Sequence, residues 1–239
     1  MALRELHRQR QALVRARLGV SNQISAICRR LTDGDKEEGR LLLSALRRRG
    51  NHPLVGVAAV STSTLVQVER HIEDGQRQLE HLMTRSAMRL AVWPRVEATR
   101  GFGALSFATI IGETGDLSSY SSHSKVWKRL GLAVIDGERQ RRVAGPARIA
   151  HGYDARRRSV SWAVGSCVMR AQSAWKDRTT GQPSRPAGAY RTGYDERKEL
   201  ELGRGLSKGH AHARAARYME KRLIRNLWRA WRDTNGLIT

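Results

Sequence analysis

Residues 3–31, LRELHRQRQALVRARLGVSNQISAICRRL, carry the pattern that decides the fold. Apolar side chains recur there every seven residues, at Leu6, Leu13, Val20 and Ile27. A companion seam has the same spacing and consists of Leu3, Arg10, Arg17, Ile24 and Leu31, so that two arginines interrupt it. This register predicts a helix that packs as a coiled coil. The helix should end at Thr32-Asp33-Gly34-Asp35, where polar turn residues replace the apolar stripe.

A second apolar seam follows a loop that contains His52-Pro53. Its members are Leu65, Val68, Ile72, Leu79 and Leu82, weakened by Gly75 and Ser86. Isolated helices of this length need tertiary partners. We therefore predict an antiparallel coiled-coil hairpin over residues 1–90, or pairing with the same helices of another protomer, which would make a homo-oligomer. The intervening acidic run, Asp33, Asp35, Glu37 and Glu38, is interpreted as a solvated loop and not a metal site.

The charge of the chain indicates a polyanionic partner. The 239 residues contain 44 Lys and Arg against 22 Asp and Glu, a formal net charge of +22. An acidic membrane surface is the alternative, but no apolar run approaches the ~18 residues of a membrane span, and no signal peptide opens the sequence. We expect a cytoplasmic, nucleoid-associated protein that binds DNA. Cys28 and Cys167 are interpreted as buried reduced thiols, and His210-Ala211-His212 as a helix start without metal.

Residues 91–239 are predicted to form a helical DNA-binding domain, so that the whole chain is mainly α. Thr99 to Glu113 is interpreted as a tight Gly-x-Gly turn followed by an apolar helix, within a helix-hairpin-helix-like motif over 95–131. Glycines at 101 and 103 allow a sharp turn that leaves backbone N–H groups free for a phosphate. A capped helix follows with further cations. The candidate phosphate-binding residues are Arg100, Gly101, Phe102, Gly103, Lys125, Lys128 and Arg129.

The segment 134–158 is rich in arginine and poor in large apolar residues. Its arginines, Arg139, Arg141, Arg142, Arg148, Arg156, Arg157 and Arg158, are candidate nucleic-acid contacts. We expect a basic loop or a β-hairpin with short strands at Val134, Ile135 and Val143. A solvated surface is the alternative, but so many like charges repel one another unless an anion neutralises them.

Two C-terminal helices are predicted, over 159–175 and 210–232, separated by a loop in 177–188. The second carries an apolar stripe of Met219, Leu223, Leu227 and Trp231 and cations elsewhere, which favours packing on its own domain over a membrane. Trp228 and Trp231 then belong to the core or its rim, with stacking on a base as the alternative.

Taken in order, these segments resemble the DEDD-type insertion-sequence transposases related to the Piv/MooV invertases, the bridge-RNA-guided recombinases. The resemblance lies in the Gly-Phe-Gly turn, Ile111-Gly112-Glu113-Thr114-Gly115-Asp116, Trp127-Lys128-Arg129-Leu130-Gly131-Leu132, and the closing Lys221-Arg222-Leu223 with Leu227-Trp228. It covers nearly the whole chain and implies a coiled coil followed by the family's C-terminal domain. It also implies a function in DNA transposition and recombination, and it raises a structured guide RNA as a partner.

Two departures separate the chain from that family. Members carry an N-terminal RuvC-like domain whose four carboxylates bind magnesium, and this sequence is expected to begin downstream of it. Magnesium is therefore expected only with a separate RuvC-like domain, and no metal site is assigned here. Members also have a nucleophilic serine where this sequence has Asp136, which cannot replace it because its acyl-phosphate would be hydrolysed. Ser159 and Ser161 are distant alternatives, and Asp116 is interpreted as a turn residue.

No catalytic residue can therefore be named from the sequence, and whether the chain is an enzyme stays open. The first hypothesis is a DNA-binding transposase or recombinase that lacks its own nuclease domain. The alternative is a noncatalytic module that bridges DNA or RNA segments. A ribosome-associated protein is disfavoured, because long low-complexity basic tails are absent.

Overall fold

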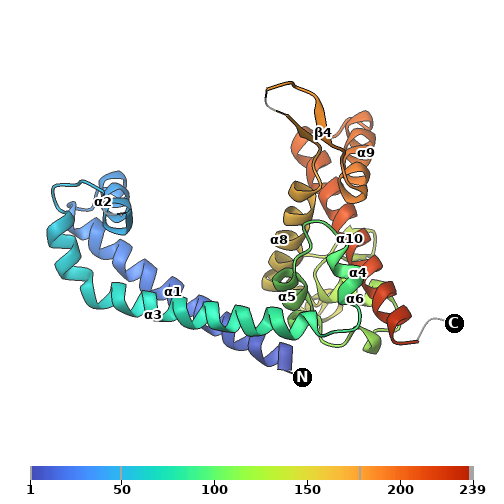
Figure 1. The fold of residues 1–239 in the computed structure, drawn as a ribbon, viewed down its shortest axis with the longest axis horizontal. Coiled ribbons are helices and arrows are strands. Elements are labelled where there is room, and N and C mark those ends of the chain that lie inside the picture. The colour runs from blue at the N-terminus through green and yellow to red at the C-terminus, as the bar shows by residue number, and fades with distance from the viewer. Residues whose placement is uncertain (1, 49, 178, 237–239) are drawn as a thin grey trace. The chain divides into compact units, whose positions relative to one another are not determined.

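The computed structural model describes residues 2–48, 50–177 and 179–236, and the chain is mainly α-helical as predicted (Figure 1). Close contacts divide it into two compact units. Leu6–Leu82 form the first, called the hairpin unit below, and the remaining described residues form the second, called the C-terminal unit. The sequence-based division after residue 90 falls just beyond Leu82.

The hairpin unit is built from α2 (Lys36–Arg48), from α1 (Ala2–Leu31) except its first four residues and from α3 (Val55–Met88) except its last six. The long helices α1 and α3 run alongside each other, with α2 near one end (Figure 1). Arg10 pairs with Glu80 at 2.7 Å and Arg17 with Glu73 at 3.3 Å. A step of seven residues forward in α1 thus matches seven backward in α3, which makes the pair antiparallel.

These two ion pairs explain the arginines that interrupt the companion seam. Arg10 and Arg17 occupy heptad positions between α1 and α3, where glutamates of α3 neutralise them. Farther along the same seam, Ile24 is fully buried, and it packs with Cys28 of α1, Leu42 of α2 and Ala58 of α3. The unit is therefore held by charge pairs along the hairpin and by an apolar cluster where α2 joins it.

The helix α2 was not predicted, since Glu37 and Glu38 were assigned to a loop. They lie in its first turn, where the Asp35 carboxylate accepts hydrogen bonds from both backbone N–H groups, at 2.8 and 3.0 Å. A carboxylate at this cap satisfies donors that a helix N-terminus leaves free. The four acidic side chains are exposed, as expected of a solvated run.

The C-terminal unit contains further helices around one core. In chain order they are α4 (Trp93–Glu97), α5 (Ala104–Thr114), the 3-10 helix η1 (Leu117–Ser119), α6 (His123–Arg129), α7 (Ala147–His151), α8 (Ala155–Ala171), α9 (Ala189–Gly203) and α10 (Lys208–Thr234). Phe107 of α5 is fully buried and contacts Phe102 edge to face, with ring centroids 6.1 Å apart. The predicted stripe of α10 is also buried: Met219, Leu223, Leu227 and Trp231.

Two features of this unit differ from the predictions. The helix α9 was not anticipated, and it pairs antiparallel with α10 through Tyr190 with Asn226 and Glu201 with Arg214. Cys167 is exposed on α8, whereas Cys28 is buried as expected. The predicted helix over 159–175 corresponds to α8, which begins and ends four residues earlier, and the predicted helix over 210–232 lies within α10, which extends two residues farther at each end.

Two short antiparallel hairpins complete the unit: β1 (Val134–Ile135) with β2 (Glu138–Arg139), and β3 (Trp175–Lys176) with β4 (Pro183–Arg185). The first has the predicted strand residues except Val143, which lies outside it. Asp136 and Gly137 form its two-residue turn, both with positive φ, of 51° and 78°. Asp-Gly is a favoured pair for this turn type. Among the described helices, none has an apolar stretch long enough to span a bilayer.

Candidate nucleic-acid interface

The Gly-x-Gly turn faces the protein interior at Gly101. This glycine has φ +85°, and a Cβ on it would lie 2.5 Å from the Ala171 Cβ and 3.0 Å from the Cys167 carbonyl oxygen of α8. Phe102 is buried, and its N–H donates to the Thr99 carbonyl oxygen at 2.9 Å. The turn thus lets residues 98–103 pack closely on α8, which is a structural reason for the glycine.

The two remaining candidates of the turn differ in their surroundings. Arg100 is half-buried, and its guanidinium donates to the Pro186 carbonyl oxygen at 3.4 Å. Its own carbonyl oxygen accepts from the Gln172 side chain at 3.2 Å. Gly103 is exposed at the start of α5, with open space around its Cβ position. Of the four predicted turn residues, Gly103 is exposed, Arg100 and Gly101 are half-buried, and Phe102 is buried.

The cations of α6 are divided between surface and interior. Lys125 and Lys128 are exposed. Arg129 is half-buried and donates to the Glu113 carbonyl oxygen at 3.0 Å. Burial lowers the pKa of Arg129, and the neighbouring Arg157 guanidinium lowers it further.

The start of α8 is fixed by a cap and by a buried glutamate. The Asp154 carboxylate accepts hydrogen bonds from the N–H groups of Arg156 and Arg157, at 2.9 and 3.2 Å. Both guanidinium groups also face Glu113 at the end of α5, at 3.3 and 3.5 Å. Only 3% of the Glu113 side chain is exposed. The first turn of α8 is therefore clamped against α5.

Arg158 makes the equivalent connection to α10. Its two terminal nitrogens approach the two Glu220 carboxylate oxygens at 2.6 and 3.3 Å, a bidentate arrangement, and 2% of the Glu220 side chain is exposed. Burial raises the pKa of Glu220, and Arg158, which acts in the opposite direction, compensates only in part. The three consecutive arginines predicted as nucleic-acid contacts, Arg156, Arg157 and Arg158, thus all pair with buried glutamates and connect α8 to α5 and α10.

Gln140 anchors the arginine-rich segment to the body of the unit. It is 2% exposed and sits between the first hairpin and α7. Its side-chain amide donates to the carbonyl oxygens of Lys128 and His151, at 3.0 and 2.6 Å, and its side-chain oxygen accepts from Ala133 N–H at 3.2 Å. One buried glutamine thereby fixes the path of the chain on both sides of residues 141–150.

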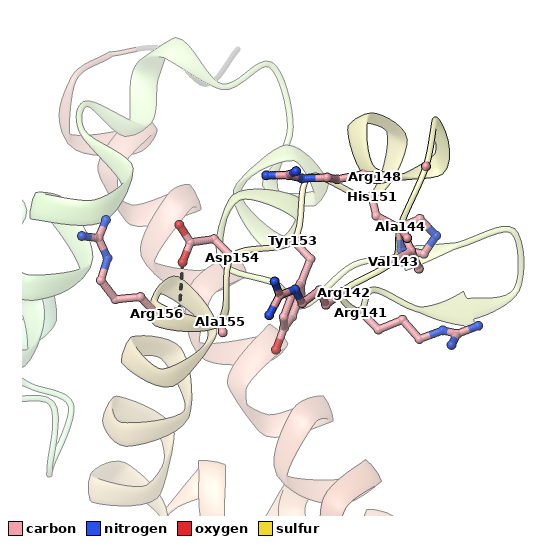
Figure 2. A pocket seen from close by; sticks show the side chains of 11 residues that line it. Arg141, Arg142, Val143, Ala144, Arg148, His151, Tyr153, Asp154, Ala155 and Arg156 are labelled. Carbon is pink, nitrogen blue, oxygen red and sulfur yellow. Dashed lines mark hydrogen bonds between the residues drawn. The ribbon is translucent and has the colours of Figure 1, made fainter.

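That path encloses a pocket of about 660 Å³, which we call the arginine pocket. It brings together four of the predicted arginines with residues from α7 and the start of α8. Its lining consists of Arg141, Arg142, Val143, Ala144, Gly145, Arg148, His151, Tyr153, Asp154, Ala155 and Arg156. Figure 2 shows Arg148 extending from α7, Arg142 from the segment after β2, and Arg156 at the start of α8.

The arginine pocket has an excess of positive charge. Asp154 is the one acidic residue in its lining, and it is already bonded to the α8 backbone. Arg141 pairs with Glu138 at 3.0 Å, and its side chain extends away from the others in Figure 2. Within the described parts of the chain, Arg142 and Arg148 have no ion-pair partner, and both are exposed. Their guanidinium groups are available to an external anion.

Arg139 lies elsewhere, in a second pocket of about 830 Å³ that also contains Arg158. The structure therefore gives the predicted arginines different surroundings. Arg141, Arg142, Arg148 and Arg156 line the arginine pocket and Arg139 lines its neighbour, whereas Arg156, Arg157 and Arg158 pair with the buried Glu113 and Glu220.

The tryptophans of α6 and α10 serve the fold. The indole N–H groups of Trp127, Trp228 and Trp231 donate to Lys221 O, Tyr120 O and the Asp116 carboxylate, at 3.0 to 3.1 Å. Asp116 in turn accepts from Ser118 N–H, so it is a turn residue as expected. Among the described residues, no group of three or more His, Cys, Asp or Glu side chains could hold a metal ion.

Sequence reasoning did not identify Gln140, His151 or Tyr153. A buried glutamine inside a basic segment carries no local signal, because its partners are backbone atoms of other segments. Tyr153 is the single aromatic residue in 134–158, and that feature could have marked it as a stacking candidate.

Comparison with known proteins returned no relative: no family model, no curated protein and no solved structure matches the chain.

Proposed function

We propose that the chain binds DNA through the phosphate backbone, with the arginine pocket as its principal contact. One observation carries this proposal: Arg142 and Arg148 line one pocket without an ion-pair partner among the described residues, and the pocket's single carboxylate is already bonded to the helix backbone. Guanidinium groups are suited to bidentate recognition of phosphate. A protein with a net charge of +22 also attracts polyanions over long distances.

The resemblance to DEDD-type transposases extends the proposal to DNA transposition or site-specific recombination. In this account the chain supplies the DNA-handling part of the reaction, a separate RuvC-like nuclease supplies the magnesium-dependent step, and a structured guide RNA is a further candidate partner. A DNA-binding protein of this charge would associate with the nucleoid.

A noncatalytic module that bridges nucleic-acid segments is the second candidate. What favours it is the use of the buried carboxylates. Glu113, Glu201 and Glu220 are at most 3% exposed, and each faces at least one arginine of its own chain. These acids are thus engaged in holding helices together, and they are poorly placed to bind a metal or to move a proton on a substrate.

The test compares two double variants with the same loss of charge. Arg142→Gln with Arg148→Gln removes two free cations of the arginine pocket. Arg185→Gln with Arg229→Gln is the matched control, since both residues are exposed and lie outside that pocket. A single charge-assisted hydrogen bond contributes roughly 1.5–3 kcal/mol. We expect the first variant to lose at least about tenfold in affinity for duplex DNA, and the control to lose much less.

The two candidates are separated by incubation with labelled supercoiled DNA, with and without magnesium and cellular RNA. Nicks or protein-linked ends would favour the recombinase. Slower migration of the DNA in a gel, without strand cleavage under any of these conditions, would favour the bridging module. Equal losses in the two double variants would contradict both, because neither would then use the arginine pocket.

A further inference from the structure

The second pocket combines an exposed aromatic ring with cations. It lies between the first hairpin, α8 and the start of α10. Its lining consists of Val134, Arg139, Arg158, Trp162, Leu206, His210, His212, Ala213, Arg214, Ala216 and Arg217. It shares no residue with the arginine pocket, although both are bordered by the same basic segment. We call it the tryptophan pocket.

Trp162 differs from the tryptophans of α6 and α10. It is 57% exposed, and within the described chain its indole makes no hydrogen bond, ring contact or cation contact. It also lines an adjoining hollow of about 320 Å³, so that it stands where two cavities meet. A large apolar ring left open in a concave basic surface is typical of stacking sites for bases.

Two cations of the tryptophan pocket have no ion pair with a carboxylate of the described residues. Arg139 is exposed and has no ion-pair partner among the described residues. Arg217 is half-buried, and among the described residues its guanidinium donates to the Gly131 carbonyl oxygen alone, at 3.3 Å. Burial lowers the pKa of Arg217, and Arg158 and Arg139 lower it further, while Glu220 acts against them. The other two arginines of the lining, Arg158 and Arg214, are paired with Glu220 and Glu201.

We propose that the tryptophan pocket receives an unpaired base of the bound DNA, which stacks on Trp162 while Arg139 and Arg217 hold the adjoining phosphates. This inference rests on the proposed DNA binding and names the form of DNA that the chain prefers. The bases of an intact duplex are already stacked on one another, and their faces are closed to a side chain. A single strand, a melted end or a junction offers the open faces that Trp162 requires.

The experiment measures affinity for four oligonucleotides of one length: duplex DNA, single-stranded DNA, the same strand with abasic sites, and RNA of the same sequence. Trp162→Ala is compared with Trp175→Ala, which removes an equally exposed tryptophan, 56% against 57%, outside the tryptophan pocket. Stacking of one base contributes ~1–3 kcal/mol. We therefore expect Trp162→Ala to weaken single-strand binding about 5- to 150-fold.

The remaining outcomes define the site. Trp162→Ala should leave binding of the duplex and of the abasic strand nearly unchanged, Trp162→Phe should retain most of the affinity, and Trp175→Ala should behave as wild type. The RNA arm tells whether a ribose strand is accepted equally, and tighter binding of RNA than of DNA would overturn DNA as the ligand. If duplex DNA binds and Trp162→Ala does not change the affinity for single-stranded DNA, the inference about the tryptophan pocket is wrong while the proposed DNA binding stands. If no oligonucleotide binds, the proposed function fails as well.

Discussion

Replacement of Gly101 by alanine tests whether the Gly-x-Gly turn is structural. A non-glycine residue at φ +85° costs about 1–2 kcal/mol. The added Cβ would also lie 2.5 Å from the Ala171 Cβ and 3.0 Å from two backbone atoms of α8. Overpacking of this kind costs typically 1–3 kcal/mol. The two costs together predict a loss of roughly 2–5 kcal/mol in the free energy of unfolding.

Intrinsic tryptophan fluorescence during thermal unfolding reports this loss of stability in the C-terminal unit, which contains Gly101. The six tryptophans of the chain all lie within 93–231, in the C-terminal unit. For a domain of this size, 1 kcal/mol shifts Tm by about 2–4 °C, so Gly101→Ala should lower Tm by ~4–20 °C. Gly103→Ala is the matched control, because nothing lies within 4 Å of its Cβ position and its φ is −71°.

A second variant separates crowding from backbone strain. Ala171→Gly in the Gly101→Ala background removes the nearest contact and should restore part of the lost Tm. The reasoning would be refuted if Gly101→Ala and Gly103→Ala were equally stable and Gly101→Ala alone lost DNA affinity. That pattern would assign the turn to phosphate binding, as the sequence first suggested.

Three further predictions follow from buried polar groups. Gln140→Leu should lower DNA affinity without changing net charge, because the segment 141–150 loses the hydrogen bonds of the Gln140 side chain that fix its path. Backbone amide hydrogen exchange in 141–150 should become faster, and unchanged exchange rates would contradict this prediction. Glu220→Ala should lower the free energy of unfolding by about 3–5 kcal/mol, since it leaves the half-buried Arg158 guanidinium without its carboxylate partner. Chemical denaturation measures this loss, and a loss below ~1 kcal/mol would count against a stabilising role of the Arg158–Glu220 ion pair. Burial raises the pKa of Glu201, but hydrogen bonds from Arg214 and Arg197 together outweigh it and lower the pKa. The ionised Glu201 carboxylate therefore contributes stability above its ordinary pKa of 4.5, and this contribution is lost as pH falls through the lower pKa of the folded state. Glu201→Gln should reduce the fall in Tm at acid pH. An unchanged fall in Tm would be inconsistent with the ion pairs of Glu201.

The sequence predicted those parts of the fold that depend on local pattern. The heptads of 3–31 and 65–82 indicated the two long helices, and Arg10 and Arg17 appeared as interruptions because their partners, Glu80 and Glu73, lie in a distant helix. The helix α9 was missed for a related reason, because its partners lie on α10: Tyr190 bonds to Asn226 and Glu201 pairs with Arg214.

The candidate site was predicted in composition but not in arrangement. The seven arginines of 134–158 are visible in the sequence, whereas the roles of Arg157 and Arg158 depend on Glu113 and Glu220, which folding brings to them. Arg158 and Glu220 are 62 positions apart. Local charge density therefore identifies the basic segment, and only tertiary contacts distinguish the arginines that face solvent from those that hold helices.

The salt dependence of duplex binding tests the central claim most directly. The logarithm of the affinity falls with the logarithm of salt concentration with a slope of about −0.9 for each phosphate neutralised. If Arg142 and Arg148 each contact one phosphate, their double replacement by glutamine should reduce the magnitude of the slope by about 1.8, whereas Arg185→Gln with Arg229→Gln should leave it unchanged. Equal slopes for wild type and the arginine-pocket variant would contradict the account.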